Sequence, residues 1–180
     1  MSGNGRPRGD RGRPLPDDPD LWEVSTVATK QWLTLEGDRF PCFNINYSVG
    51  VGGINQIDDL ILIQAMFRFI AKGFGELSTL GLTSINELSR LTGILDRNTI
   101  NTIRSYQRRW TRLLLNVDGL IHPADYIARD LKLDPTTRRM AMTLLHQHAQ
   151  DAGFRLGETD YTTAMVRMFP ELRGFVRPLW

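Results

Sequence analysis

Residues 49–64 determine the fold that the sequence predicts, because a glycine-rich turn leads there directly into an amphipathic helix. They read Val49-Gly-Val-Gly-Gly-Ile-Asn-Gln-Ile-Asp-Asp-Leu-Ile-Leu-Ile-Gln64. The clustered glycines favour a turn with positive φ, which glycine adopts at little cost. Asp58 or Asp59 can then cap a helix by accepting a backbone N–H that has no partner within the helix. The apolar residues that follow recur at intervals of three or four, which predicts one buried helix face made of Leu60, Ile63, Met66, Phe67 and Ile70.

Two further stretches continue the helical pattern. The first is Thr92-Gly-Ile-Leu-Asp-Arg-Asn-Thr-Ile-Asn-Thr-Ile-Arg-Ser-Tyr-Gln107, and the second is Val117-Asp-Gly-Leu-Ile-His-Pro-Ala-Asp-Tyr126. Asp96 can cap the second helix, whose apolar side comprises Ile100, Ile103, Tyr106 and Trp110. The Asp118-Gly119 pair favours a turn, and Pro123 suits the first turn of a third helix. These stretches predict the order helix, loop, helix, turn, helix.

The same stretches resemble the helical peptidoglycan-binding domain found beside many bacterial and phage wall hydrolases. In that family an aliphatic helix ends in Leu-Gln, a Gly-x-x-Asp/Gly-x-x-Thr segment opens a second helix ending in an aromatic-Gln pair, and a Val-Asp-Gly turn follows. The matching residues here are Ile63-Gln64, Gly93-x-x-Asp96-x-x-Thr99, Tyr106-Gln107 and Val117-Asp118-Gly119. The resemblance covers roughly residues 49–133. Two features depart from the family pattern. Thr83–Leu91 predicts an inserted helix opened by a capping box, and His122-Pro123 stands where the family often has a Gly-Pro-like turn.

The resemblance implies a shallow ligand groove between the second helix and its flanking loops, with peptidoglycan as the ligand. The ligand-binding residues expected there are Asn98, Asn101, Tyr106 and Asp118.

The composition excludes several classes of function. No apolar run approaches the roughly 20 residues that span a bilayer, so we expect no membrane partner. A net charge of +2 is too small to indicate nucleic acid as a partner. Cys42 is the single cysteine, which rules out an internal disulfide and suits a small buried hydrophobe. The first residues lack the apolar segment of a signal peptide, which predicts a protein made in the cytoplasm.

The chain outside residues 49–133 divides into three segments. Residues 1–20 form an arm rich in Gly, Pro, Arg and Asp, with too few apolar groups to fold alone. Residues 21–48 are rich in β-branched and aromatic residues, in part alternating, around a turn at 36–39, which predicts a β-hairpin. Residues 134–180 predict a helix opening at Asp134-Pro135, a short helix over Tyr161–Phe169, and an apolar tail.

These segments favour contacts with other protein subunits, since a lone hairpin is marginal in water and an exposed apolar tail is unfavourable. The expected partner-binding residues are Arg6, Arg8, Arg11 and Arg13 in the arm, and Phe175 and Trp180 in the tail. For the arm, docking along a neighbouring subunit, contact with nucleic acid and a plain disordered tail all stay open.

Catalysis and metal binding find little support in the sequence. The adjacent acids at 17–18 and 58–59 suit a tail and a helix start, and nothing resembles a nucleophile elbow or a phosphate loop. The histidines are His122, His146 and His148, and the last two lie two residues apart, so they point to different faces of a helix. We therefore expect no enzyme activity, no metal site and no cofactor.

We expect a mainly α protein, a small helical bundle of the peptidoglycan-binding-domain type with an N-terminal β-hairpin and an extended arm. Its function would be that of a non-catalytic peptidoglycan-binding-like module carried by a bacteriophage virion or a phage-tail-like particle. The alternative is a purely structural virion or tail assembly protein that uses the same fold and its arms to interlock subunits.

Overall fold

The structure is a computed structural model that describes residues 28–35, 38–88, 90–114, 116–124, 140–174 and 176–177. Several expectations lie outside these residues. They are the arm with Arg6, Arg8, Arg11 and Arg13, the helix start at Asp134-Pro135, and the tail residues Phe175 and Trp180.

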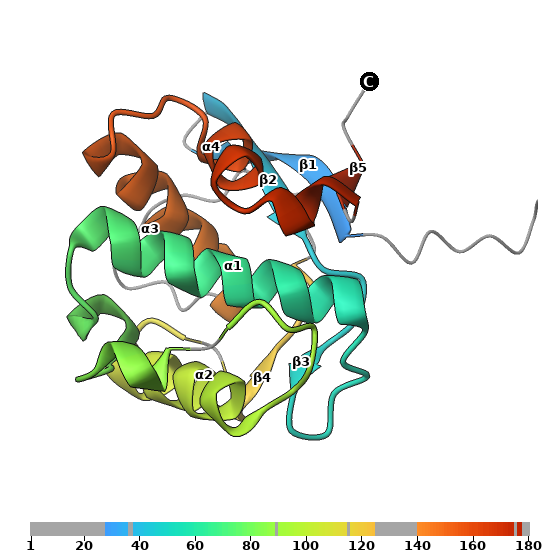
Figure 1. The fold of residues 1–180 in the computed structure, drawn as a ribbon, viewed down its shortest axis with the longest axis vertical. Coiled ribbons are helices and arrows are strands. Elements are labelled where there is room, and N and C mark those ends of the chain that lie inside the picture. Colours follow the sequence, from blue (N-terminus) through green and yellow to red (C-terminus); the bar gives the residue numbers. More distant parts are fainter. Residues whose placement is uncertain are drawn as a thin grey trace, which may run out of the picture.

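The described chain is mainly helical, with a β-hairpin on its N-terminal side, as the sequence predicts (Figure 1). Helix α1 (Ile57–Phe74) crosses the middle of the molecule. Helix α2 (Arg97–Arg109) lies on one side of α1, and α3 (Ala141–Arg155) and α4 (Tyr161–Met168) lie on the other. Short 3₁₀ helices connect these elements: η2 (Ser78–Leu80), η3 (Ile85–Glu87) and η4 (Pro170–Gly174).

The strands form two small sheets. β1 (Ala28–Leu35) pairs antiparallel with β2 (Asp38–Asn44), from Thr29 opposite Asn44 to Leu35 opposite Asp38, which confirms the predicted hairpin. β5 (Val176–Arg177) adds to β1 in parallel, giving the order β2-β1-β5. The second sheet pairs β3 (Val49–Gly50) antiparallel with β4 (Leu120–Ile121). It joins the chain just before α1 to the chain just after α2.

The core surrounds α1 on nearly every side. Its Leu62, Ile63, Met66, Phe67 and Phe69 are fully buried, so the burial is wider than the single face that the apolar spacing predicts. The reason is that α1 packs against α2 on one side, where the Phe67 and Tyr106 rings meet edge to face, and against α3, α4 and the hairpin on the other. The predicted apolar sides of the two helices share one core, because Leu60 and Ile63 of α1 and Ile103 and Tyr106 of α2 belong to the same buried cluster.

The helix starts agree with the sequence at α2 and differ at α1. Asp96 caps α2 by accepting the backbone N–H of Thr99 at 2.7 Å. The predicted cap of α1 by Asp58 or Asp59 is wrong, because the helix begins at Ile57 and Gln56 is the residue before it. The Asp59 carboxylate instead accepts the backbone N–H groups of Asn46 and Tyr47, at 3.0 and 2.9 Å. It thereby ties the end of the hairpin to α1. Burial raises the pKa of Asp59, and these two hydrogen bonds lower it in part.

The insertion between α1 and α2 is also less helical than predicted. It contains η3 in place of a longer helix, and Ser84 caps it by accepting the N–H of Asn86 at 3.2 Å. The expected capping box does not form as such, since the Glu87 carboxylate accepts the hydroxyl of Thr83 at 2.7 Å. In the part of the chain that the structure describes, no helix is long and apolar enough to cross a bilayer.

Candidate functional site

The side chain of Gln64 connects the motif residues that open α2. Gln64 is fully buried, and its Oε1 accepts the backbone N–H groups of Thr92 and Gly93 at 2.9 and 3.1 Å. Its Nε2 donates to the carbonyl of Ile94 and to Oγ1 of Thr99, both at 3.0 Å. The Thr99 hydroxyl donates in turn to the carboxylate of the cap, Asp96, at 2.7 Å. We call these contacts the Gln64 network, and they hold the loop at 92–96 against α1.

Gln107 makes an equivalent set of contacts at the end of α2. Its Oε1 accepts the N–H of Gly119 at 2.7 Å, and its Nε2 donates to the carbonyl of Leu120 at 2.8 Å. Asp118 completes the turn by accepting the N–H of Leu120 at 2.9 Å, as the Asp-Gly pair predicts. Gly119 has φ +82°, a conformation that suits glycine. We call these contacts the Gln107 network.

The glycine-rich turn before α1 is held by a third amide. Oδ1 of Asn55 accepts the N–H of Gly50 at 2.8 Å, and its Nδ2 donates to the carbonyls of Gly50 and Gly53 at 2.9 and 2.7 Å. Asn55 itself has φ +58°, which asparagine tolerates better than most residues. Each of the three loops is therefore fixed by a side-chain amide bonded to backbone groups.

These three loops meet on one side of the molecule. A Cβ added to Gly50 would lie 2.2 Å from the carbonyl oxygen of Gly119, so the first and third loops are in direct contact. A Cβ added to Gly93 would lie 2.8 Å from Cγ2 of Ile57, so the second loop packs on the start of α1. We define the three-loop face as the surface formed by residues 48–57, 92–96 and 117–122.

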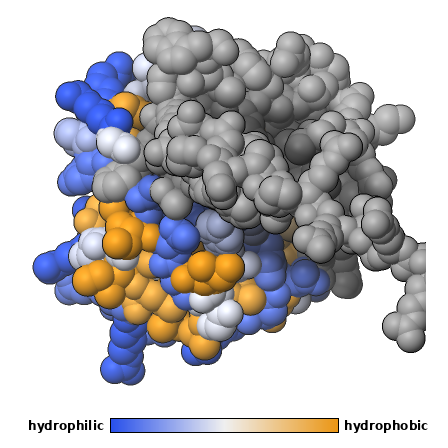
Figure 2. All heavy atoms as spheres, turned by 90° about the vertical axis from the view of Figure 1, so that its right-hand side faces the viewer, coloured by the Kyte–Doolittle hydropathy of each residue, from blue (hydrophilic) through white to orange (hydrophobic). Residues whose placement is uncertain are grey.

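Large aliphatic side chains are exposed on the three-loop face. Ile54 is 65% exposed, Ile57 62% and Ile94 65%, with Val51 and Val117 close to one half exposed. Figure 2 shows apolar residues gathered on the lower part of the side of the molecule that carries β3 and the start of α1. Contiguous exposed apolar groups on a folded domain mark contact surfaces. These side chains contribute little to the core.

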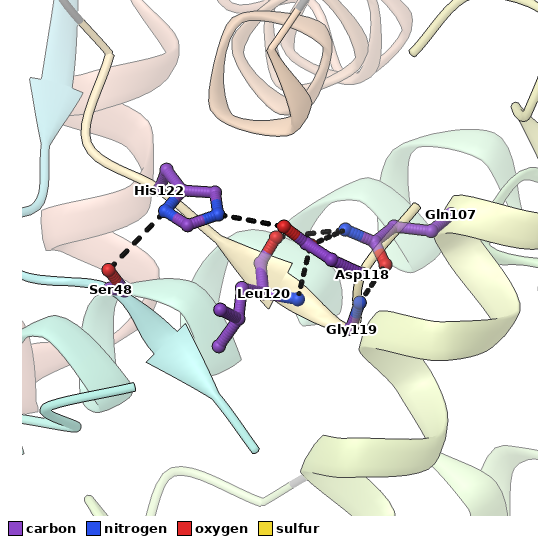
Figure 3. Close-up of polar contacts among 6 residues, drawn as sticks. All are labelled: Ser48, Gln107, Asp118, Gly119, Leu120 and His122. Atoms are coloured by element: carbon purple, nitrogen blue, oxygen red, sulfur yellow. Dashed lines mark hydrogen bonds and ion pairs between the residues drawn. The ribbon is translucent and has the colours of Figure 1, made fainter. Parts of the chain in front are cut away.

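A polar cluster lies beside them (Figure 3). Nε2 of His122 hydrogen-bonds the Asp118 carboxylate at 2.9 Å, and its Nδ1 lies 3.4 Å from the hydroxyl of Ser48. Partial burial raises the pKa of Asp118, but hydrogen bonds from His122, Leu120 and Gln107 outweigh it, so the net effect is a lowered pKa. Asp118 is therefore an anion at neutral pH, and Arg104 lies close to the adjacent Gly119.

The order Ser48, His122, Asp118 matches the residue types of a hydrolytic triad, but the surroundings do not suit acyl transfer. The Ser48–His122 distance of 3.4 Å is long, and the His122 and Asp118 side chains are 34% and 38% exposed. An oxyanion needs backbone N–H donors aimed at it. The nearby N–H groups of Asn46, Tyr47 and Gly50 already donate to side chains of this chain. The geometry of this cluster therefore differs from that of an acyl-transfer site.

The structure separates the four predicted ligand-binding residues. Asp118 lies on the three-loop face, and Asn101 is exposed on α2. Asn98 donates to the carbonyl of Asn86 at 3.0 Å, which places it beside η3. Tyr106 is fully buried, so its expected role in the ligand groove is wrong. Its hydroxyl pairs with Nδ1 of His148 at 2.9 Å, and burial raises its pKa well above the ordinary value.

The two histidines of α3 are structural. His146 bonds the hydroxyl of Tyr161 at 2.5 Å and His148 bonds Tyr106, so the two rings face α4 and α2 respectively, as their spacing predicts. Burial lowers the pKa of His146 to about 3. Among the described residues, no three His, Cys, Asp or Glu side chains come together in a group that could hold a metal ion.

No protein-family model matches the sequence, and no curated protein or solved structure matches it either. The candidate site therefore rests on its own geometry and on the four short motifs.

Proposed function

We propose that the chain is a non-catalytic peptidoglycan-binding-like module, carried by a phage or phage-tail-like particle, whose three-loop face contacts the wall polymer. The observation that carries the proposal is the use of the motif residues. Gln64, Asp96, Thr99, Gln107 and Gly119 each hold one of the loops of this face. The residues that carry the resemblance thus hold the loops of this surface in place. The exposed aliphatic side chains on these loops contribute little to the core and are available to a ligand.

The chemistry of the face suits such a ligand. Peptidoglycan combines sugar rings, which have apolar C–H faces and hydroxyls, with peptide stems that carry methyl groups, carboxylates and an amine. The exposed aliphatic side chains Ile54 and Ile57 suit the apolar parts. The anionic Asp118 suits an amine or a hydroxyl, and Arg104 suits a carboxylate.

Co-sedimentation with purified peptidoglycan sacculi tests the proposal. The variants Ile54→Ser and Ile94→Ser change exposed side chains, so they should melt within about 2 °C of the wild type and bind about tenfold more weakly. Phe154→Ser is the matched control, because Phe154 is 58% exposed on α3, away from the three-loop face. It should bind as the wild type does. Failure of the wild type to sediment, or equal binding by all three variants, would refute the proposal.

The alternative, a structural assembly protein, has support of its own at the hairpin. In the described part of the chain, β2 pairs with β1 on one edge and with no strand on the other. The end of β2 is covered, because Phe43 is buried and its N–H donates to the hydroxyl of Tyr161 at 3.4 Å. The part of β2 before Cys42 is an edge that can accept a strand from another subunit. We propose it as a subunit contact, together with the predicted contacts of the arm and tail. Analytical ultracentrifugation at increasing concentration should then show self-association, and a monomer at every concentration would contradict self-assembly through this edge.

A further inference from the structure

An open pocket of about 640 Å³ lies at the far end of α1 from the three-loop face. Its walls come from the last turns of α1, from η3, and from the junction of α4 and η4 at Met168 and Phe169. Ile57 of the three-loop face and Lys72 of the pocket lie near opposite ends of α1, and an α-helix of this length separates them by roughly 20 Å. We call this the α1 pocket, and it is a separate site from the three-loop face.

The α1 pocket combines apolar walls with a small excess of positive charge. Arg68 and Lys72 lie one helical turn apart on the same side of α1, and Glu76 is the acidic residue in the lining. Leu88, Met168 and Phe169 supply apolar surface. The C-terminal carbonyls of α1 add a partial negative charge, which Lys72 offsets from the last turn. The charged side chains of the lining all come from α1 and the residues just after it, and the facing wall is apolar.

This combination points to an amphipathic anion as the ligand. Pockets that hold small ligands typically measure about 300–1,000 Å³, with mostly apolar walls and a few polar groups that fix orientation. A carboxylate can pair with Lys72 while an apolar group packs on Phe169. Glu76 can accept an N–H, which a peptide has and a fatty acid lacks. The pocket is also open to solvent, which suits the end of a chain better than a lipid tail.

We propose that the α1 pocket binds the C-terminal end of a peptide whose last residue is apolar. Its carboxylate lies against Lys72, its last side chain packs on Met168 and Phe169, and a backbone N–H donates to Glu76. The proposal does not depend on wall binding by the three-loop face.

The test uses the full chain and a fluorescein-labelled hexapeptide that ends in Val-Leu with a free carboxylate. Fluorescence anisotropy should show that this peptide binds about tenfold more tightly than the same peptide with a C-terminal amide. Lys72→Gln should weaken binding of the free-carboxylate peptide by about tenfold, and Lys72→Arg should restore it. Arg108→Gln, an exposed arginine of α2 outside the pocket, is the matched control and should have no effect.

Several results would overturn the proposal. They are no binding of the peptide up to about 1 mM, equal binding of the carboxylate and amide forms, or an unchanged affinity in Lys72→Gln. Octanoate provides the lipid comparison. If octanoate displaces the peptide at a concentration below the Kd of the peptide, the pocket is assigned to fatty acids instead. Binding of sacculi by the Lys72→Gln variant should equal that of the wild type, which separates this site from the three-loop face.

Discussion

Replacing Gln64 by methionine tests whether a buried amide, more than helix packing, positions the start of α2. Methionine nearly matches glutamine in size and is unbranched, so the packing within α1 should stay close to that of the wild type. The substitution removes every hydrogen bond of the Gln64 network that involves this side chain.

The expected cost follows from the groups that lose a partner. The N–H of Gly93 lies at a buried position, and an unsatisfied buried donor costs about 1–3 kcal/mol. Thr92 and Ile94 are exposed, so water can replace part of their lost bonds, at about 0.5 kcal/mol each. Thr99 keeps its bond to Asp96 and adds little. The sum is a loss of about 3 kcal/mol in the free energy of unfolding.

Urea unfolding followed by circular dichroism measures this loss. An unchanged m-value shows that both proteins unfold in the same two-state manner, so that their free energies of unfolding can be compared. Gln56→Met is the matched control, since the Gln56 side chain does not cap α1, and it should change the stability by less than about 0.5 kcal/mol. A loss below about 1 kcal/mol in Gln64→Met would show that packing alone places the loop, and the reasoning would fail.

Three further predictions concern the core, the pH dependence and the first turn. Ile103→Ala should lower the free energy of unfolding by about 2–5 kcal/mol, because Ile103 is fully buried, and an unchanged thermal midpoint would contradict this. The pKa of His146 is depressed to about 3 in the folded chain, so below pH 6.5 the unfolded chain binds the extra proton. Stability should therefore fall by roughly 1.5 kcal/mol between pH 6.5 and 5; this slope should vanish in His146→Asn and persist in His122→Gln. Gly50→Ala should be far more destabilising than Gly52→Ala. Both glycines have positive φ, but only at Gly50 would an added Cβ meet a backbone oxygen, at 2.2 Å. Equal thermal midpoints of the two variants would show that the β3–β4 contact can open without cost.

The sequence predicts a local structure best when the residues that form it lie close together in the chain. The Asp96 cap and the Asp118-Gly119 turn each depend on residues within a turn of one another, and both are confirmed. The hairpin is predictable because alternating apolar residues surround a turn. β4 is not, because two residues are too short to show a period.

The long-range contacts of the candidate site could not be predicted. Ser48 and His122 lie 74 positions apart, and no local pattern marks them as neighbours. The role of Gln64 is similar, since its partners begin 28 residues later. The sequence predicts Asp59 as a helix cap because an acid that follows glycines is typical of a helix start. In the structure, its carboxylate bonds backbone N–H groups of the preceding chain instead.

Tyr106 illustrates two conflicting signals at one position. The family resemblance implies that Tyr106 lies beside the ligand groove. Its spacing from Ile103 places it on the apolar side of α2, and the structure follows that spacing. Periodicity was the stronger guide because burial of a large side chain contributes more free energy than a single surface contact.

The Gln64 network has a consequence for how the chain can change. Because Gln64 bonds residues 92–94 directly, the loop that opens α2 is fixed to α1 as well as to the chain between the two helices. Residues 75–91 also hold α2, since Leu80, Leu82 and Leu88 belong to the core and the carbonyls of Thr79, Asn86 and Glu87 accept hydrogen bonds from α2 and Trp110. Changes of sequence or length in this segment are therefore expected at its exposed positions, such as Gly75 and Glu76, where closing a slightly longer loop costs little. This segment includes η3, which forms one wall of the α1 pocket. The exposed part of the pocket wall can thus change in sequence while Gln64, Gln107 and Asn55 keep the loops of the three-loop face in place.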